Sequence, residues 1–171
     1  EAGEEEAADA RLAQAVETAA RATDKKQAAE ALLAVRRSYP GTTASQEALY
    51  RAGVLSFEAG DYPNARKALK ELLFENPLFR EAKDAKHKLA LSALKVGDHR
   101  EAYQLLTSLA EDAEGPERDS YLQDAARAAE GAGLSGEALE MAVRTAGEAQ
   151  TPEAQAGAVA RVEGLVEGRP G

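Results

Sequence analysis

The 171-residue chain has no cysteine, no tryptophan and only two histidines. The lack of cysteine excludes disulfide bonds, thiol nucleophiles and thiolate metal ligands, and it fits a reducing or an oxidising compartment equally well. The two histidines, His87 and His99, have neither the spacing of a histidine metal motif nor a third ligand beside them. We therefore expect no metal and no cofactor.

Aromatic residues make up 5% of the chain, and isoleucine is absent, whereas 39 of the 171 residues are alanine. Alanine is the best helix former and a poor strand former. This composition favours closely packed helices with small residues at their crossings over a β-sheet.

Long apolar runs and an excess of basic residues are also missing. No stretch is apolar enough for a membrane span, so we expect no membrane insertion of this segment. The net charge is −9, and an acidic surface repels phosphate backbones, which argues against nucleic-acid binding. No pair of carboxylates is placed for acid–base chemistry, and no glycine-rich phosphate loop follows a strand. We expect no enzyme activity and no catalytic residue.

What the chain does contain is an internal period. Three aspartates and three alanines each recur at intervals of 37 residues, and a fourth alanine follows 36 residues later. These residues are Asp24, Asp61 and Asp98, then Ala28, Ala65, Ala102 and Ala138. A single period in this range indicates a helical-repeat solenoid.

The second copy of the repeat is the clearest. It contains Leu49, Gly53, Gly60-Asp61-Tyr62, Ala65 and Pro77 in order. With this order and spacing the sequence resembles the tetratricopeptide-repeat family, although its period is longer than the family's by two or three residues, which we expect within residues 76–81 and their equivalents. The resemblance implies an all-α solenoid of about four helix pairs plus a C-terminal capping helix.

The residue types fit this reading. Gly53 and Ala65 are predicted at the crossing of two paired helices, where a larger side chain would overpack the contact. Gly60 is expected to end the first helix of its pair, and Asp61 and Asp98 are expected to cap the next helices.

The expected helices and domain boundaries follow from the same pattern. The predicted helices are about 5–21, 24–38, 43–59, 62–75, 79–96, 99–112, 117–132, 135–148 and 152–167. We expect one repeat domain over residues 1–168, with repeats at about 9–42, 46–79, 83–116 and 119–152, a capping helix at 152–167 and a linker at 169–171.

The family resemblance also implies a site, because the first helices of such pairs line an inner groove that receives another protein or a peptide segment. The candidate groove residues are Glu47, Tyr50, Val54, Phe57, His87, Leu91 and Arg127. Tyr50, Val54, Phe57 and Leu91 form an apolar stripe, which either binds a partner segment or packs against a neighbouring helix. The slots in which relatives clamp a terminal carboxylate hold no cations here, so we expect no such clamp.

A second resemblance concerns the cellular location and the kind of protein to which the chain belongs. Residues 38–42 followed by 47–53 are similar to envelope repeat proteins of Gram-negative bacteria, including activator lipoproteins of penicillin-binding proteins. This resemblance implies a non-catalytic scaffold on the periplasmic side of the outer membrane that regulates cell-wall synthesis, with a cell-wall synthase as partner. It also implies a lipid-anchoring export signal before the segment and an α/β ligand-binding domain after it. A cytoplasmic adaptor, or a structural arm of a larger multidomain protein, remains the alternative.

Overall fold

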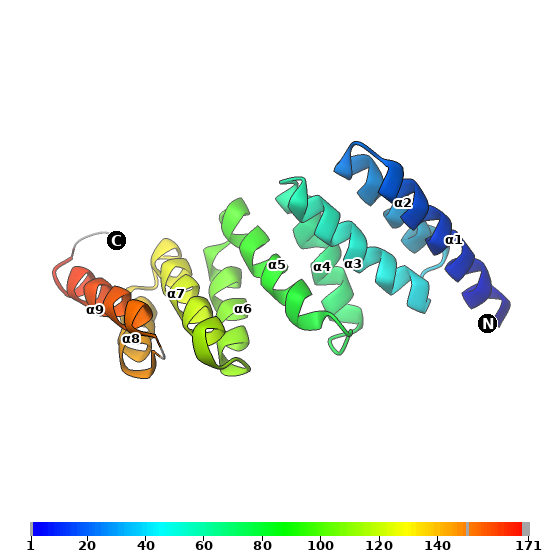
Figure 1. Ribbon diagram of the computed structural model, residues 1–171. Coiled ribbons are helices and arrows are strands. Elements are labelled where there is room, and N and C mark those ends of the chain that lie inside the picture. Colours follow the sequence, from blue (N-terminus) through cyan, green and yellow to red (C-terminus); the bar gives the residue numbers. More distant parts are fainter. Residues whose placement is uncertain (1, 150, 169–171) are drawn as a thin grey trace. The chain divides into compact units, whose positions relative to one another are not determined.

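The computed structural model describes residues 2–149 and 151–168, and every regular element in these two ranges is an α-helix (Figure 1). The helices are α1 (Ala2–Arg21), α2 (Lys25–Ser38), α3 (Thr43–Glu58), α4 (Tyr62–Glu75), α5 (Ala82–Val96), α6 (His99–Glu111), α7 (Gly115–Gly131), α8 (Ser135–Glu148) and α9 (Pro152–Val166). The all-α prediction is confirmed, and each helix begins and ends within three residues of its predicted limits.

The chain divides into two compact units, Glu1–Ser92 and Ala93–Gly171, and the division falls within α5. In the first unit α1 packs on α2 and α3, α2 packs on α3, and α3 packs on α4. In the second unit α6 packs on α7, α7 on α8, and α9 on both α8 and α7. Contacts between consecutive helices are the packing that a helical repeat requires. The single domain over residues 1–168 stays a prediction.

Small residues bring the paired helices together, as the repeat predicts. Gly53 of α3 is buried, and a Cβ atom added to it would lie 2.6 Å from Cγ and Cδ2 of Leu69 on α4. Ala65 is fully buried on the same helix as Leu69. The equivalent alanines Ala28, Ala102 and Ala138 are buried too, so the period in the sequence is a period of burial in the structure.

The turn between α3 and α4 follows one expectation and departs from another. Gly60 has a φ of 71°, and its N–H donates to the carbonyl of Phe57, which ends α3 as expected. Asp98 caps α6 by accepting a bond from the Glu101 N–H. The prediction that Asp61 caps α4 is wrong, because its side chain makes no capping bond and instead accepts one from the Asn64 amide at 2.8 Å. Pro63, in the first turn, has no N–H to offer.

The connection between α4 and α5 is longer than its equivalents. Residues 76–81 form the connection between α4 and α5, whereas the equivalent connections are residues 39–42 and 112–114. The longer connection brings Phe79, Arg80 and Glu81 to the side of α3, where they help to form the site described below.

The C-terminal helix α9 packs through small side chains. Ala154 and Ala158 are its buried residues, whereas Val159 and Val166 are 44% and 70% exposed. Val162 and Leu165, four and seven residues after Ala158, lie on the same side of the helix and are half-buried. The predicted linker, residues 169–171, lies outside the described residues.

Candidate partner-binding hollow

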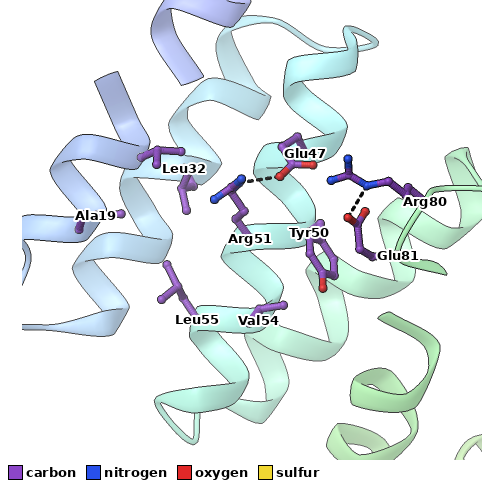
Figure 2. A pocket seen from close by; sticks show the side chains of 11 residues that line it. Ala19, Leu32, Glu47, Tyr50, Arg51, Val54, Leu55, Arg80 and Glu81 are labelled. Carbon is purple, nitrogen blue, oxygen red and sulfur yellow. Dashed lines mark hydrogen bonds and ion pairs between the residues drawn. The ribbon is translucent and has the colours of Figure 1, made fainter. Parts of the chain in front are cut away.

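An open hollow of about 450 Å³ lies in the first unit, between α1, α2, α3 and the connection from α4 to α5 (Figure 2). Three of the predicted groove residues, Glu47, Tyr50 and Val54, line it from α3. The full lining is Val16, Ala19, Ala20, Leu32, Glu47, Tyr50, Arg51, Val54, Leu55, Arg80 and Glu81. We call this cavity the hollow.

Helix α3 supplies the central wall because its larger side chains and its alanines lie on different faces. Glu47, Tyr50 and Val54 are three and four positions apart and therefore share one face of the helix. Ala48 and Ala52, on another face, are completely buried and allow neighbouring helices to approach closely. The larger side chains are left to face the hollow.

The opposite wall is apolar and comes from the first pair of helices. Val16, Ala19 and Ala20 lie on the last turns of α1, and Leu32 lies on α2. Leu32 is only 1% exposed, so it forms the floor rather than the rim. Small side chains on α1 leave space that larger ones would fill, and an apolar side chain entering this space would be removed from water.

Tyr50 is held in a fixed orientation at one end of the hollow. Its ring centroid lies 5.5 Å from that of Phe79, and its hydroxyl donates to Oδ2 of Asp84 at 2.8 Å. Burial and this hydrogen bond raise the pKa of Tyr50 to about 12. The phenol therefore stays protonated and continues to donate its hydrogen bond at any physiological pH.

Asp84, the acceptor, is itself kept ionised. Burial would raise the pKa of Asp84, but hydrogen bonds from Lys88 and Tyr50 outweigh burial and hold that pKa below its ordinary value. The Lys88 Nζ atom lies 2.6 Å from Oδ1 of Asp84. This polar cluster ties α5 to α3 within the first unit.

The rim of the hollow carries charges that are paired with one another. Arg51 Nε donates to Glu47 at 2.6 Å, and Arg80 Nε donates to Oε1 of Glu81 at 2.5 Å (Figure 2). The second oxygen of Glu81, Oε2, is shielded from solvent and has no hydrogen-bond partner among the described residues. An unpaired shielded carboxylate oxygen is costly and is therefore a point where a ligand donor would be favourable.

The other predicted groove residues do not line the hollow. Phe57 is half-buried and packs edge-on against Tyr62, with ring centroids 5.7 Å apart. His87 and Leu91 are half-buried on α5. Arg127 lies in the second unit, exposed on α7 and 3.4 Å from Asp124. Their roles in binding stay predictions.

Sequence reasoning missed the α1 wall and the charged pair of the long connection. Val16, Ala19 and Ala20 belong to the first repeat, which matches the repeat pattern least, so the pattern did not predict that they line a site. Arg80 and Glu81 lie in the connection where extra residues were expected, but no residue pattern marked them as lining a site.

No group of three or more possible metal ligands occurs within residues 2–149 and 151–168. In the same ranges, none of the helices has the length and apolar character that crossing a bilayer demands. Gly133, in the glycine-rich stretch after α7, has a φ of 72° and ends that helix. This stretch is a helix-terminating turn.

Comparison with known proteins gives one result for the family. Residues 47–77 match the model of the tetratricopeptide repeat. The matched range begins at Glu47 and includes the α3 side of the hollow together with all of α4. No curated protein matches the chain. Residues 47–77 are therefore a tetratricopeptide-like repeat within an all-α fold of consecutively packed helices.

Proposed function

We propose that the chain is a non-catalytic scaffold that holds a segment of a partner protein in the hollow. Tetratricopeptide repeats in general serve as protein–protein interaction modules. The observation that carries the proposal is an open cavity whose wall and floor are apolar and whose rim is charged (Figure 2). Binding sites with an apolar interior and a few placed polar groups are the usual form of a recognition pocket.

The half-exposed state of Tyr50 and Val54 supports this reading. Side chains that only fill a core would be buried, whereas these two keep a surface towards the hollow. Because Tyr50 is already oriented by Asp84 and Phe79, it loses little conformational freedom when a partner covers it.

The experiment is selection of binders from a displayed random-peptide library, followed by affinity measurement on synthetic peptides. We expect Val54→Asp to weaken the selected peptides by at least about tenfold, since a charge would replace apolar contact surface. Val143→Asp is the matched control, because Val143 is 52% exposed on α8 in the second unit. Peptides that bind both variants as well as the unchanged protein would contradict the proposal.

The setting that we propose is the bacterial envelope, with the chain as the repeat module of an outer-membrane lipoprotein and a cell-wall synthase as its partner. The similarity of residues 38–42 and 47–53 to envelope repeat proteins supports it. Sequencing the complete gene tests it through the presence of an export signal ending in a cysteine for lipid attachment. A complete gene that encodes no export signal would contradict it and favour the cytoplasmic adaptor.

A further inference from the structure

We infer that the partner segment carries a lysine or arginine that pairs with Glu81, beside the apolar side chain that fills the hollow. This inference rests on the proposed function and specifies the chemistry of the partner. It comes from the arrangement of carboxylates at one end of the cavity and from one of them, Glu81, whose second oxygen is shielded from solvent and has no donor among the described residues.

Three carboxylates surround the Tyr50 end of the hollow. Asp84 accepts the Tyr50 hydroxyl directly, and the charges of Glu81 and Glu47 also act on that hydroxyl. This end of the cavity is therefore charged, each carboxylate with a basic partner, whereas the α1 end consists of apolar side chains (Figure 2).

The three carboxylates differ in how well they are satisfied. Asp84 has donors on both oxygens, from Tyr50 and from Lys88. Glu47 is paired with Arg51 on the next turn of the same helix. Glu81 has Arg80 on Oε1 and no donor on Oε2 among the residues that the structure describes.

Arg80 would compete only weakly with a partner cation for Glu81. Its side chain is 80% exposed and neighbours Glu81 in sequence, so the pair is a surface ion pair that contributes little to stability. The donor-free oxygen of Glu81 is already shielded from water, so it is costly before a partner binds. A cation from the partner can displace the Arg80 side chain and donate to both oxygens, as an arginine does in a bidentate pair.

An acidic partner segment is disfavoured at the same place. Its carboxylate would lie near Glu47, Glu81 and Asp84, while the nearby arginines Arg51 and Arg80 are already paired. Like charges brought together in a water-poor site repel strongly. The donor-free oxygen of Glu81 can accept a hydrogen bond from a basic group but not from a carboxylate, which favours a basic and apolar segment over an acidic one.

The test uses peptides that are selected on the unchanged protein and that bind the Val54→Asp variant more weakly. We expect them to share a lysine or arginine at a constant distance from a large apolar residue. Glu81→Gln keeps the shape of the side chain and removes its charge, and it should weaken these peptides by about tenfold or more. The matched control is Glu58→Gln, because Glu58 is also in an ion pair, with Lys25, but lies outside the hollow.

A peptide in which the basic residue is replaced by glutamine extends the test independently of protein folding. We expect this peptide to lose about as much affinity as Glu81→Gln causes, and the two changes together should cost little more than either alone. Peptides that depend on Val54 but not on Glu81, or that share an acidic residue, would overturn this inference and leave the proposed function standing. If no selected peptide depends on Val54, the proposed function fails and this inference fails with it.

Discussion

Single small residues control how the helices of this protein meet. Gly53 is the clearest case, because the space that a Cβ atom would take is occupied by the Leu69 side chain at 2.6 Å. Leu69 is itself completely buried and cannot swing into solvent. Glycine at this position is therefore required by packing, and its conformational freedom is not needed there.

Replacement of Gly53 by leucine should lower the free energy of unfolding by about 1–3 kcal/mol, since an overpacked crossing relaxes only if the backbone moves. Urea denaturation measures the change. Gly147→Leu is the control, because Gly147 is exposed in α8 and nothing lies within 4 Å of its added Cβ. Gly168 would be unsuitable, because its φ of 69° would strain any larger residue. Equal unfolding midpoints for the two variants would show that the crossing is not tightly packed.

Tyr50 gives a second prediction at this scale, in alkaline solution. Its pKa of about 12 in the folded protein exceeds the ordinary value of 10.0. Between these pH values the folded state retains a proton that the unfolded state releases, so Tyr50 stabilises the fold below pH 10 and this contribution is lost as pH rises towards 12. Ultraviolet absorbance titration should show one late-ionising tyrosine that is missing in Tyr50→Phe. A wild-type protein whose tyrosines all ionise together near pH 10 would disprove the assignment.

At the scale of the helix, two of the three repeated aspartates have different roles. Asp98 accepts a capping bond from Glu101 N–H at 3.2 Å, whereas Asp61 bonds the Asn64 side chain. The sequence pattern could not separate them, because both precede a helix by one residue. In α4 the first turn contains Pro63, which has no N–H, and the Asp61 carboxylate accepts from the Asn64 side-chain amide.

Asp98→Ala should therefore destabilise the protein by about 1 kcal/mol, the usual cost of removing a helix cap. Asp61→Ala should cost distinctly less, since it mainly removes one exposed hydrogen bond between two side chains. Thermal unfolding of both variants measures the difference. A larger destabilisation by Asp61→Ala would mean that Asp61 caps α4 in solution.

The helices themselves could be predicted because period, alanine content and glycine positions all depend on local sequence. Part of the site could be predicted as well, since Glu47, Tyr50 and Val54 share a face of one helix. The remainder depends on how separate helices pack. Arg127 shares the repeat register of these residues but lies in the second unit, and the α1 wall becomes visible only when α1 is placed against α3.

At the scale of the whole molecule, alanine dominates the buried interior of the described chain. In α1 the buried residues are Ala8 and Ala15, and in α9 they are Ala154 and Ala158. In α4, by contrast, Leu69 and Leu72 are buried as well. An alanine side chain removes far less apolar surface from water than a leucine does. The first and last helices therefore bury less apolar side chain completely than α4 does, and α1 adds only partly buried side chains such as Leu12 and Val16.

This limited burial has a consequence for the hollow, because one of its walls belongs to α1. Helices with little buried apolar surface open locally at a small cost in free energy, which amide hydrogen exchange detects. We expect the amides of α1 to exchange much faster than those of α3 and α4, and to slow when a selected peptide occupies the hollow. Uniform exchange rates across α1, α3 and α4 would disprove this. A wall that opens at low cost lets the recognition site adjust its width to bulky side chains, and part of the binding free energy is then spent on ordering α1.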